Sequence, residues 1–115
     1  MRNISFTLTT AAVRERRKTV TRRLGWTDKL KPGDILQAVE KAQGLKKGEH
    51  VKPICLIRVV SVRREWLTDI GLYDPSETAR EGFPELTKWQ FQDMFSKANG
   101  LKMNVQVNRI EFEYA

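Results

Sequence analysis

The chain begins with an alternation of apolar and polar positions. Ile4, Phe6 and Leu8 are the apolar members of residues 4–9, and a period of two is typical of a strand with one buried face. Thr10 then precedes the apolar residues 11–13, which suits a hydroxyl N-cap ahead of one or two helical turns. The sequence therefore predicts an opening strand followed by a short helix.

Two further apolar runs predict central strands. Pro32-Gly33-Asp34 marks a turn before residues 35–39, and Pro53 opens a run that continues to Val62. Between these runs, residues 41–52 contain four lysines and few apolar side chains. This composition indicates a mobile hairpin loop rather than a linker between domains.

Capping signatures predict two helices in the second half of the chain. Asp74-Pro75-Ser76-Glu77 combines an N-cap acid, a proline at the first helical position and a glutamate three residues after the cap, so a short helix capped by Asp74 is expected to run to Glu81 and stop at Gly82. Thr87 and Gln90 form a second capping box. An apolar helical stripe follows it and ends at Asn99-Gly100; its members are Phe91, Met94, Phe95 and Ala98.

The last segment, residues 103–114, alternates with a phase slip near Asn108, which predicts a closing strand with a bulge. With 115 residues and 40% hydrophobic content, the chain is expected to form a single domain spanning residues 1–115. Runs of strands separated by lone helices predict an α+β fold. We expect a small, curved, mainly antiparallel sheet or β-barrel flanked by short helices.

Charge favours an anionic partner, since 21 Lys and Arg oppose 14 Asp and Glu for a net charge of +7. A solvated basic surface without a partner is the alternative. Cys55 lies in an apolar run, where a buried inert thiol is expected. His50 is the only histidine, so no metal site, serine triad or cofactor is expected. The N-terminus resembles neither a signal peptide nor a membrane span, and a cytoplasmic location is expected.

The densest cluster of charge lies between Arg14 and Arg23, with six basic residues and one acid in ten positions. Because like charges repel, a folded protein that keeps such a cluster together usually has an anionic ligand or a carboxylate facing it, and an exposed helix end is the alternative. Lys18 and Thr21 lie three apart within it. If the stretch is helical, the amine and the hydroxyl share a face; if it is extended, they face opposite sides.

Two more residues are candidates on position. Glu81 is predicted at a helix C-terminus, where the helix dipole disfavours a carboxylate, although a solvated glutamate in a loop is an equal alternative. Trp89 falls off the apolar stripe of its helix and is a candidate platform for stacking a base, with packing against the preceding loop as the alternative.

Four motifs, taken in order, resemble those of the ASCH domain in the PUA-like superfamily. They are KTVTRR (residues 18–23), LKPGD (30–34), EGF (81–83) and RIEF (109–112). The resemblance extends from Ile4 to Tyr114 and implies a small PUA-like β-barrel. It further implies a cleft lined by the segment after the first helix and by the Glu-Gly-Phe turn.

Compact bacterial members of this family are amidohydrolases acting on N4-acetylcytidine, and others are associated with RNA binding. In the enzymes a lysine, a threonine three residues later and a distant glutamate form the catalytic set. The matching residues here are Lys18, Thr21 and Glu81. The resemblance thus implies an acylated cytosine nucleoside or base as the partner, with RNA as the alternative, and involves no membrane or metal.

Amide hydrolysis requires a nucleophile, a proton acceptor and a donor for the leaving amine. Thr21, or a water beside it, is expected to attack the acyl carbonyl, while neighbouring arginines lower the pKa of Lys18 so that it acts as a base. Glu81 is expected to bond the cytosine edge and pass a proton to N4. Arg23 is a candidate oxyanion donor, and Phe6 a candidate for stacking on the base, with core packing as its alternative.

Two other functions remain open at this level. A non-catalytic RNA-binding module would present an open basic groove, joining residues 14–23 to the lysines of the 41–52 loop, with salt-sensitive affinity. A ribonuclease would use the same lysine and hydroxyl. The amidohydrolase interpretation instead predicts a closed pocket and a partly desolvated Lys18, with Lys18, Thr21 and Glu81 all expected outside the core.

Overall fold

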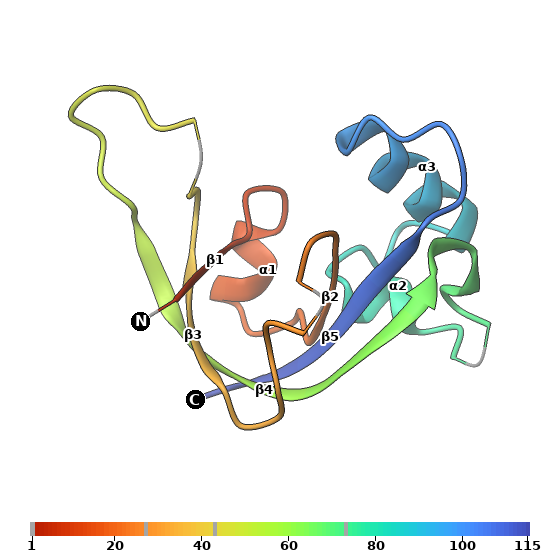
Figure 1. Ribbon diagram of the computed structural model, residues 1–115, viewed down its shortest axis with the longest axis horizontal. Coiled ribbons are helices and arrows are strands. Elements are labelled where there is room, and N and C mark those ends of the chain that lie inside the picture. Colours follow the sequence, from red (N-terminus) through yellow and green to blue (C-terminus); the bar gives the residue numbers. More distant parts are fainter. Residues whose placement is uncertain (1, 27, 43, 73) are drawn as a thin grey trace.

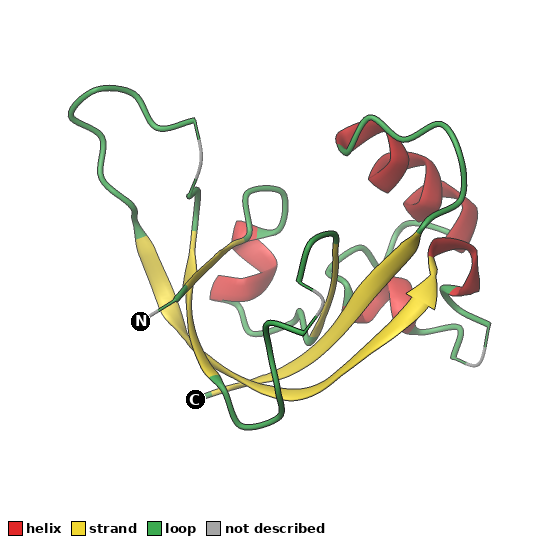
Figure 2. Cartoon of the chain, in the orientation of Figure 1, coloured by secondary structure: helices red, strands yellow, loops and turns green. Residues whose placement is uncertain are grey.

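The computed structural model describes residues 2–26, 28–42, 44–72 and 74–115 and has an α+β fold, as the sequence predicted (Figures 1 and 2). Five strands form one sheet, and short helices lie against it. In chain order the elements are β1 (Asn3–Ser5), α1 (Thr10–Arg14), β2 (Val20–Arg23), β3 (Ile35–Val39), β4 (Pro53–Trp66), the 3₁₀ helix η1 (Leu67–Asp69), α2 (Glu77–Arg80), α3 (Lys88–Ala98) and β5 (Gln106–Tyr114).

The strands are ordered β1-β3-β4-β5-β2, and the longest pairing joins β4 to β5. Figure 1 shows these two strands bending together across the molecule. β1 pairs with β3 in parallel, whereas the other pairings are antiparallel. The sheet is curved but not closed, because β1 and β2 are its ends in the described chain. The expected curved, mainly antiparallel sheet is confirmed, and the one parallel pairing is possible because α1 and β2 intervene between β1 and β3.

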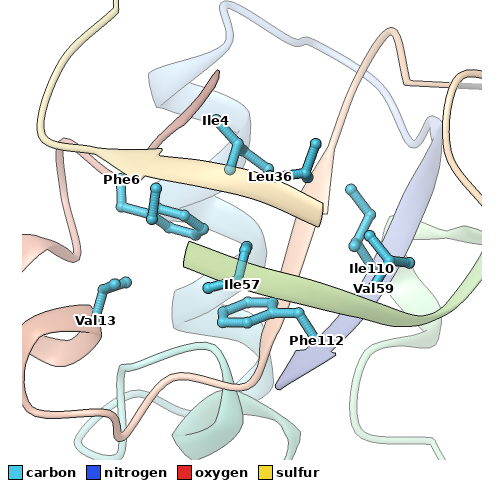
Figure 3. Packing of buried hydrophobic residues seen from close by; sticks show 9 residues of the cluster. Ile4, Phe6, Val13, Leu36, Ile57, Val59, Ile110 and Phe112 are labelled. Carbon is cyan, nitrogen blue, oxygen red and sulfur yellow. The ribbon is translucent and has the colours of Figure 1, made fainter. Parts of the chain in front are cut away.

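The main core lies on the concave side of the sheet (Figure 3). Ile4 and Phe6 are buried there with Ile57 and Phe112, as the opening alternation predicted. Leu8 is 67% exposed, which contradicts its expected place on the buried face. The reason is that β1 ends at Ser5 and the chain then turns into α1.

A second apolar cluster forms under α3 and includes Phe91 and Phe95, as the predicted stripe requires. The capping box of α3 is confirmed, since the Thr87 hydroxyl accepts from the Gln90 backbone N–H and the Gln90 side chain accepts from that of Thr87. The predicted start of α2 at Asp74 is wrong. The Asp74 carboxylate accepts from the backbone and hydroxyl of Ser76 and closes a turn before the helix.

The expected bulge near Asn108 is also wrong. Pairing of β5 with β4 is continuous through Asn108, the pairing with β2 ends there, and the irregularity lies in β4, between Val59 and Ser61. Residues 107–110 are all buried. The phase slip in the sequence therefore arises because both faces of β5 are covered here: Ile110 lies in the main core, while Arg109 bonds Glu77 on the other face.

The loop between β3 and β4 connects antiparallel neighbours, so the predicted hairpin at residues 41–52 is confirmed, although residue 43 lies outside the described residues. Figure 1 shows it extending well away from the sheet. No helix in the described part of the chain is long and apolar enough to cross a membrane.

Candidate active site

A cavity of about 470 Å³ lies between the β1–α1 connection, β2, the turn after α2, and α3. Five of the six site residues predicted from the sequence line it: Phe6, Lys18, Thr21, Arg23 and Glu81. Trp89 is absent from its wall. That side chain is 68% exposed on α3, with the Lys88 amine 4.7 Å from its ring centroid.

Lys18 reaches the cavity from an irregular segment between α1 and β2. Arg16 has a φ of +59°, which turns the chain immediately after the helix. The Lys18 backbone is held on both sides, since its N–H donates to Ala12 and its carbonyl accepts from the Tyr114 hydroxyl at 2.5 Å. Lys18 and Thr21 therefore share neither a helix nor a strand. They nevertheless line one cavity, because the strand begins only at Val20.

The Lys18 amine is bonded to Glu81 twice. Its Nζ lies 2.9 Å from Glu81 Oε1 and 2.5 Å from the Glu81 carbonyl oxygen. Both side chains are only 3% exposed. Burial lowers the pKa of Lys18, attraction to Glu81 opposes this, and repulsion from Arg23 and Arg22 lowers the pKa further. The predicted direction agrees, but burial rather than like charge is the main cause.

The turn after α2 fixes the position of Glu81. Glu81 is the C-cap of that helix, and Gly82 follows with a φ of +98°. A Cβ at Gly82 would lie 3.1 Å from the Ala12 side chain and 3.3 Å from that of Thr9. Glycine is therefore needed both for the left-handed backbone and for close packing of this turn on α1.

Thr21 and Arg23 project from the same face of β2, since they are two residues apart in a strand. The Arg23 guanidinium donates to the Thr21 hydroxyl oxygen at 2.9 Å and also to the Ser5 carbonyl oxygen. Its central carbon lies 4.9 Å from the Phe6 ring centroid. Burial lowers the pKa of Arg23 to about 10, against attraction from Glu81, so it remains a cation at neutral pH.

Phe6 packs in the core, which confirms that alternative, whereas its stacking on a base stays a prediction. It is 1% exposed and packs in the core, with its ring centroid 5.7 Å from that of Phe112. It also borders the cavity, where the Lys18 amine lies 6.0 Å from its ring centroid.

A buried ionic network behind the cavity was not anticipated from sequence. Arg22 bonds Glu81, Glu77 and Glu65, and Arg109 holds Glu77 from the other side. The expectation that the basic cluster needs facing carboxylates is confirmed for Arg22 and Lys18. The clustering of basic residues in the sequence indicated that carboxylate partners were needed. These partners lie 43 to 63 residues away in sequence, so residue spacing did not identify them.

The outer members of the basic cluster are also paired. Arg14 lies 2.5 Å from Glu40, Arg17 lies 2.8 Å from Glu15, and the Arg16 guanidinium carbon lies 5.5 Å from the Tyr114 ring centroid. Arg22 and Arg23 are directed inward. The cluster is therefore divided, with Lys18, Arg22 and Arg23 lining the cavity and Arg14, Arg16 and Arg17 outside it.

Lys18, Thr21 and Glu81 are only 2%, 3% and 3% exposed, so their expected placement outside the core is corrected. These three buried polar side chains form one part of the cavity lining, and apolar side chains of α3 and of the segment before it form another part, the apolar end. The apolar lining includes Phe83, Phe91, Met94, Phe95 and Ala98. In the described chain no group of three or more His, Cys, Asp or Glu side chains is arranged to hold a metal ion.

No family model matches the sequence, and no curated protein matches it significantly. Two solved structures match its fold. Protein EF3133 from Enterococcus faecalis V583, described under the family model DUF984, gives a TM-score of 0.66 at 15% identity, covering 100% of this chain and 76% of that one. An ASCH domain from Lactobacillus crispatus JV V101 gives 0.55 at 20% identity, covering 97% and 77% respectively.

The chain thus has a mixed α+β fold built on a curved five-stranded sheet, compatible with a PUA-like architecture. Within that class, its fold is that of an ASCH domain. The resemblance indicated by the order of the four motifs is confirmed at the level of the fold.

Proposed function

We propose that this protein is an amidohydrolase that removes the acyl group from N4-acylated cytosine nucleosides or bases. The observation that carries this proposal is the meeting of an amine, a hydroxyl and a carboxylate on one cavity wall, from Lys18, Thr21 and Glu81. They match the catalytic set implied by the sequence resemblance. Amide hydrolysis needs a nucleophile, a base and an acid, and these groups supply all three.

The hydrogen bonds of Lys18 suit a neutral amine. A neutral amine has two N–H donors and one lone pair, and the structure offers two acceptors, Glu81 Oε1 and the Glu81 carbonyl oxygen. Both donors are then used and the lone pair stays available to accept a proton. Burial, which lowers the pKa of Lys18, favours the same form.

In the proposed reaction the Thr21 hydroxyl oxygen, or a water beside it, attacks the acyl carbon while its proton passes to Lys18. The carbonyl oxygen becomes an oxyanion, which the cationic Arg23 stabilises. As the tetrahedral intermediate collapses, the bond from the acyl carbon to N4 breaks and Lys18 returns the proton to N4. Water hydrolyses the acyl-threonine if Thr21 is the nucleophile. The net products are cytidine or cytosine and a carboxylic acid.

The rest of the cavity suits the two ends of such a substrate. The N4–H of the amide is a donor, and the Glu81 carboxylate is an acceptor that orients it. The Arg23 guanidinium, which is backed on one face by the Phe6 ring, offers its other face to a planar base. The apolar end under α3 offers space for the acyl group.

The proposal is tested by incubating the purified protein with N4-acetylcytidine and following the ultraviolet spectrum as cytidine forms. Lys18→Met is expected to reduce turnover by about 10²- to 10⁴-fold, the usual contribution of a general base. Lys46→Met is the matched control, because Lys46 is exposed in the loop between β3 and β4. Circular dichroism establishes that both variants are folded.

A parent protein that releases no cytidine, or a Lys18→Met variant as active as the parent, contradicts the proposal. Salt-sensitive RNA binding without hydrolysis would favour the RNA-binding module instead, and RNA cleavage dependent on Lys18 would favour the ribonuclease. The inward pairing of Lys18 and Arg22 favours the amidohydrolase over an open RNA groove.

A further inference from the structure

Arg22 occupies an unusual position for an arginine in a small domain. It lies in β2, is only 4% exposed, and places its guanidinium among three carboxylates. The distances are 3.0 Å to Glu81, 2.6 Å to Glu77 and 3.1 Å to Glu65. Removing an arginine from water costs free energy, and the charged hydrogen bonds to the three carboxylates offset that cost.

The two carboxylate oxygens of Glu81 are divided between the Lys18 amine and the Arg22 guanidinium. Oε1 accepts from Lys18 at 2.9 Å, and Oε2 accepts from Arg22 at 3.0 Å. A buried carboxylate bonded to Lys18 alone would hold that amine in its charged form. Because Oε2 of Glu81 is bonded to Arg22, only part of that carboxylate's attraction acts on the amine, and the charge of the guanidinium itself opposes protonation of Lys18.

Arg22 is itself fixed from behind. Glu77 accepts from Arg22 at 2.6 Å and from Arg109 at 2.8 and 3.1 Å. Burial raises the pKa of Glu77, but the hydrogen bonds from Arg109 and Arg22 outweigh it and lower the pKa to about 2. Glu77 therefore remains charged at any pH near neutrality, and its carboxylate keeps the guanidinium of Arg22 in place.

We infer that Arg22, held by Glu77, is a positioning residue that shares Glu81 with Lys18 and so keeps Lys18 neutral and ready to act as a base. This inference rests on the proposed function and explains how Lys18 is kept in the form that accepts a proton. It assigns no contact between Arg22 and the reacting atoms. It rests on the sharing of the Glu81 carboxylate between the Lys18 amine and the Arg22 guanidinium.

The other charged or titratable groups facing Lys18 do not replace Arg22. Arg23, on the same strand, repels the amine, and its nearest bonds are to Thr21 and Ser5. The Tyr114 hydroxyl on β5 donates to the Lys18 carbonyl, and burial raises its pKa to about 12, so it is uncharged near neutral pH. From the turn after α2, Glu81 supplies the carboxylate that Arg22 shares.

The first test measures the pKa of Lys18 directly, by NMR of protein labelled with ¹³C at the lysine ε-carbon, with Lys18→Met to assign the signal. Arg22→Met fills the space without a charge and is expected to raise the pKa of Lys18. Glu77→Gln removes a negative charge beside Arg22, so the positive charge near Lys18 is less compensated and the pKa of Lys18 is expected to fall. Removing or adding a nearby buried charge shifts a pKa by about 1 to 3, so each dissociation constant should change at least about tenfold.

The opposite signs separate the inference from a general loosening of the site, which would raise the pKa in both variants. Arg58→Gln is the matched control for Arg22→Met, because it also removes one positive charge, but at an exposed pair with Glu113. No shift in Arg22→Met, a rise in Glu77→Gln, or an equal shift in the control overturns the inference. If Arg22→Met does not fold, the sign found in Glu77→Gln decides by itself.

The second test uses hydrolysis and separates the inference from the proposed function. The rate should fall below the pH at which Lys18 becomes protonated, and Arg22→Met should move that fall to higher pH. Arg22→Lys, which retains a cation, should restore the profile towards that of the parent. A parent without hydrolase activity defeats the proposed function, whereas the NMR result still decides whether Arg22 controls the protonation of Lys18.

Discussion

The Arg23 guanidinium donates a hydrogen bond to the Thr21 hydroxyl oxygen at 2.9 Å. Since arginine only donates, the hydroxyl proton of Thr21 must point to another acceptor. The same bond places a positive charge beside the oxygen and stabilises it as it loses its proton. In the proposed reaction, this bond would help Thr21 to act as the nucleophile.

We predict different outcomes for Thr21→Val and Thr21→Ser, because only the serine variant keeps the hydroxyl. Thr21→Val removes the hydroxyl and should reduce turnover of N4-acetylcytidine by about 10²-fold or more, if covalent attack is used. Thr21→Ser keeps the hydroxyl and should retain most of the activity. Mass spectrometry of the parent, quenched during turnover, should detect an acyl group on Thr21. Full activity in Thr21→Val would assign the attack to water.

Acid stability should depend on Glu77. Its pKa is about 2 in the fold against an ordinary value of 4.5. A lowered carboxyl pKa contributes stability above pH 4.5, and that contribution is lost as the pH falls towards 2. It amounts to up to about 3 kcal/mol. Urea unfolding between these pH values should show a steep loss in the parent and a shallower one in Glu77→Gln. Glu113→Gln, at an exposed pair, should follow the parent.

Gly82→Ala should be destabilising and should also impair catalysis. The new methyl group meets Ala12 and Thr9 at 3.1 and 3.3 Å, on a backbone with a φ of +98°. A loss of about 1 to 3 kcal/mol is expected from the backbone conformation alone. Because Glu81 immediately precedes it, displacement of the turn should also lower kcat. Gly100→Ala is the control, since its φ is positive but nothing lies within 4 Å of the added Cβ; equal kcat values in the two variants would contradict the prediction.

The apolar end of the cavity should set the size of acyl group accepted. Met94 lines it from α3, so Met94→Trp should reduce hydrolysis of N4-benzoylcytidine more than that of N4-acetylcytidine. Trp89→Ala, on the same helix but exposed and outside the cavity, should change neither rate. Comparison of kcat/KM for the two substrates checks this. An equal loss for both would place the acyl group elsewhere, and a loss in Trp89→Ala would restore its predicted role in stacking.

Local patterns in the sequence were sufficient to predict most of the elements. The capping box at Thr87, the turn at Pro32-Gly33-Asp34 and the apolar run of β4 each depend on interactions between residues close in sequence. The alternation of apolar and polar residues gave a wrong prediction where both faces of a strand are buried. Residues 107–110 resembled a bulge because Val107 packs in the cluster under α3 on one face of β5, whereas Ile110 packs in the main core on the other face.

The sequence by itself determined the α+β class, the fold indicated by the order of its motifs, and the identity of Lys18, Thr21 and Glu81 as candidates. Tertiary structure alone decided that these three line one cavity, that Trp89 lies outside it, and that Arg22 shares Glu81 with Lys18. The physical reason is distance along the chain. Glu81 lies 63 residues from Lys18 and 59 from Arg22, so only the packing of the turn after α2 against β2 and α1 brings their charges together.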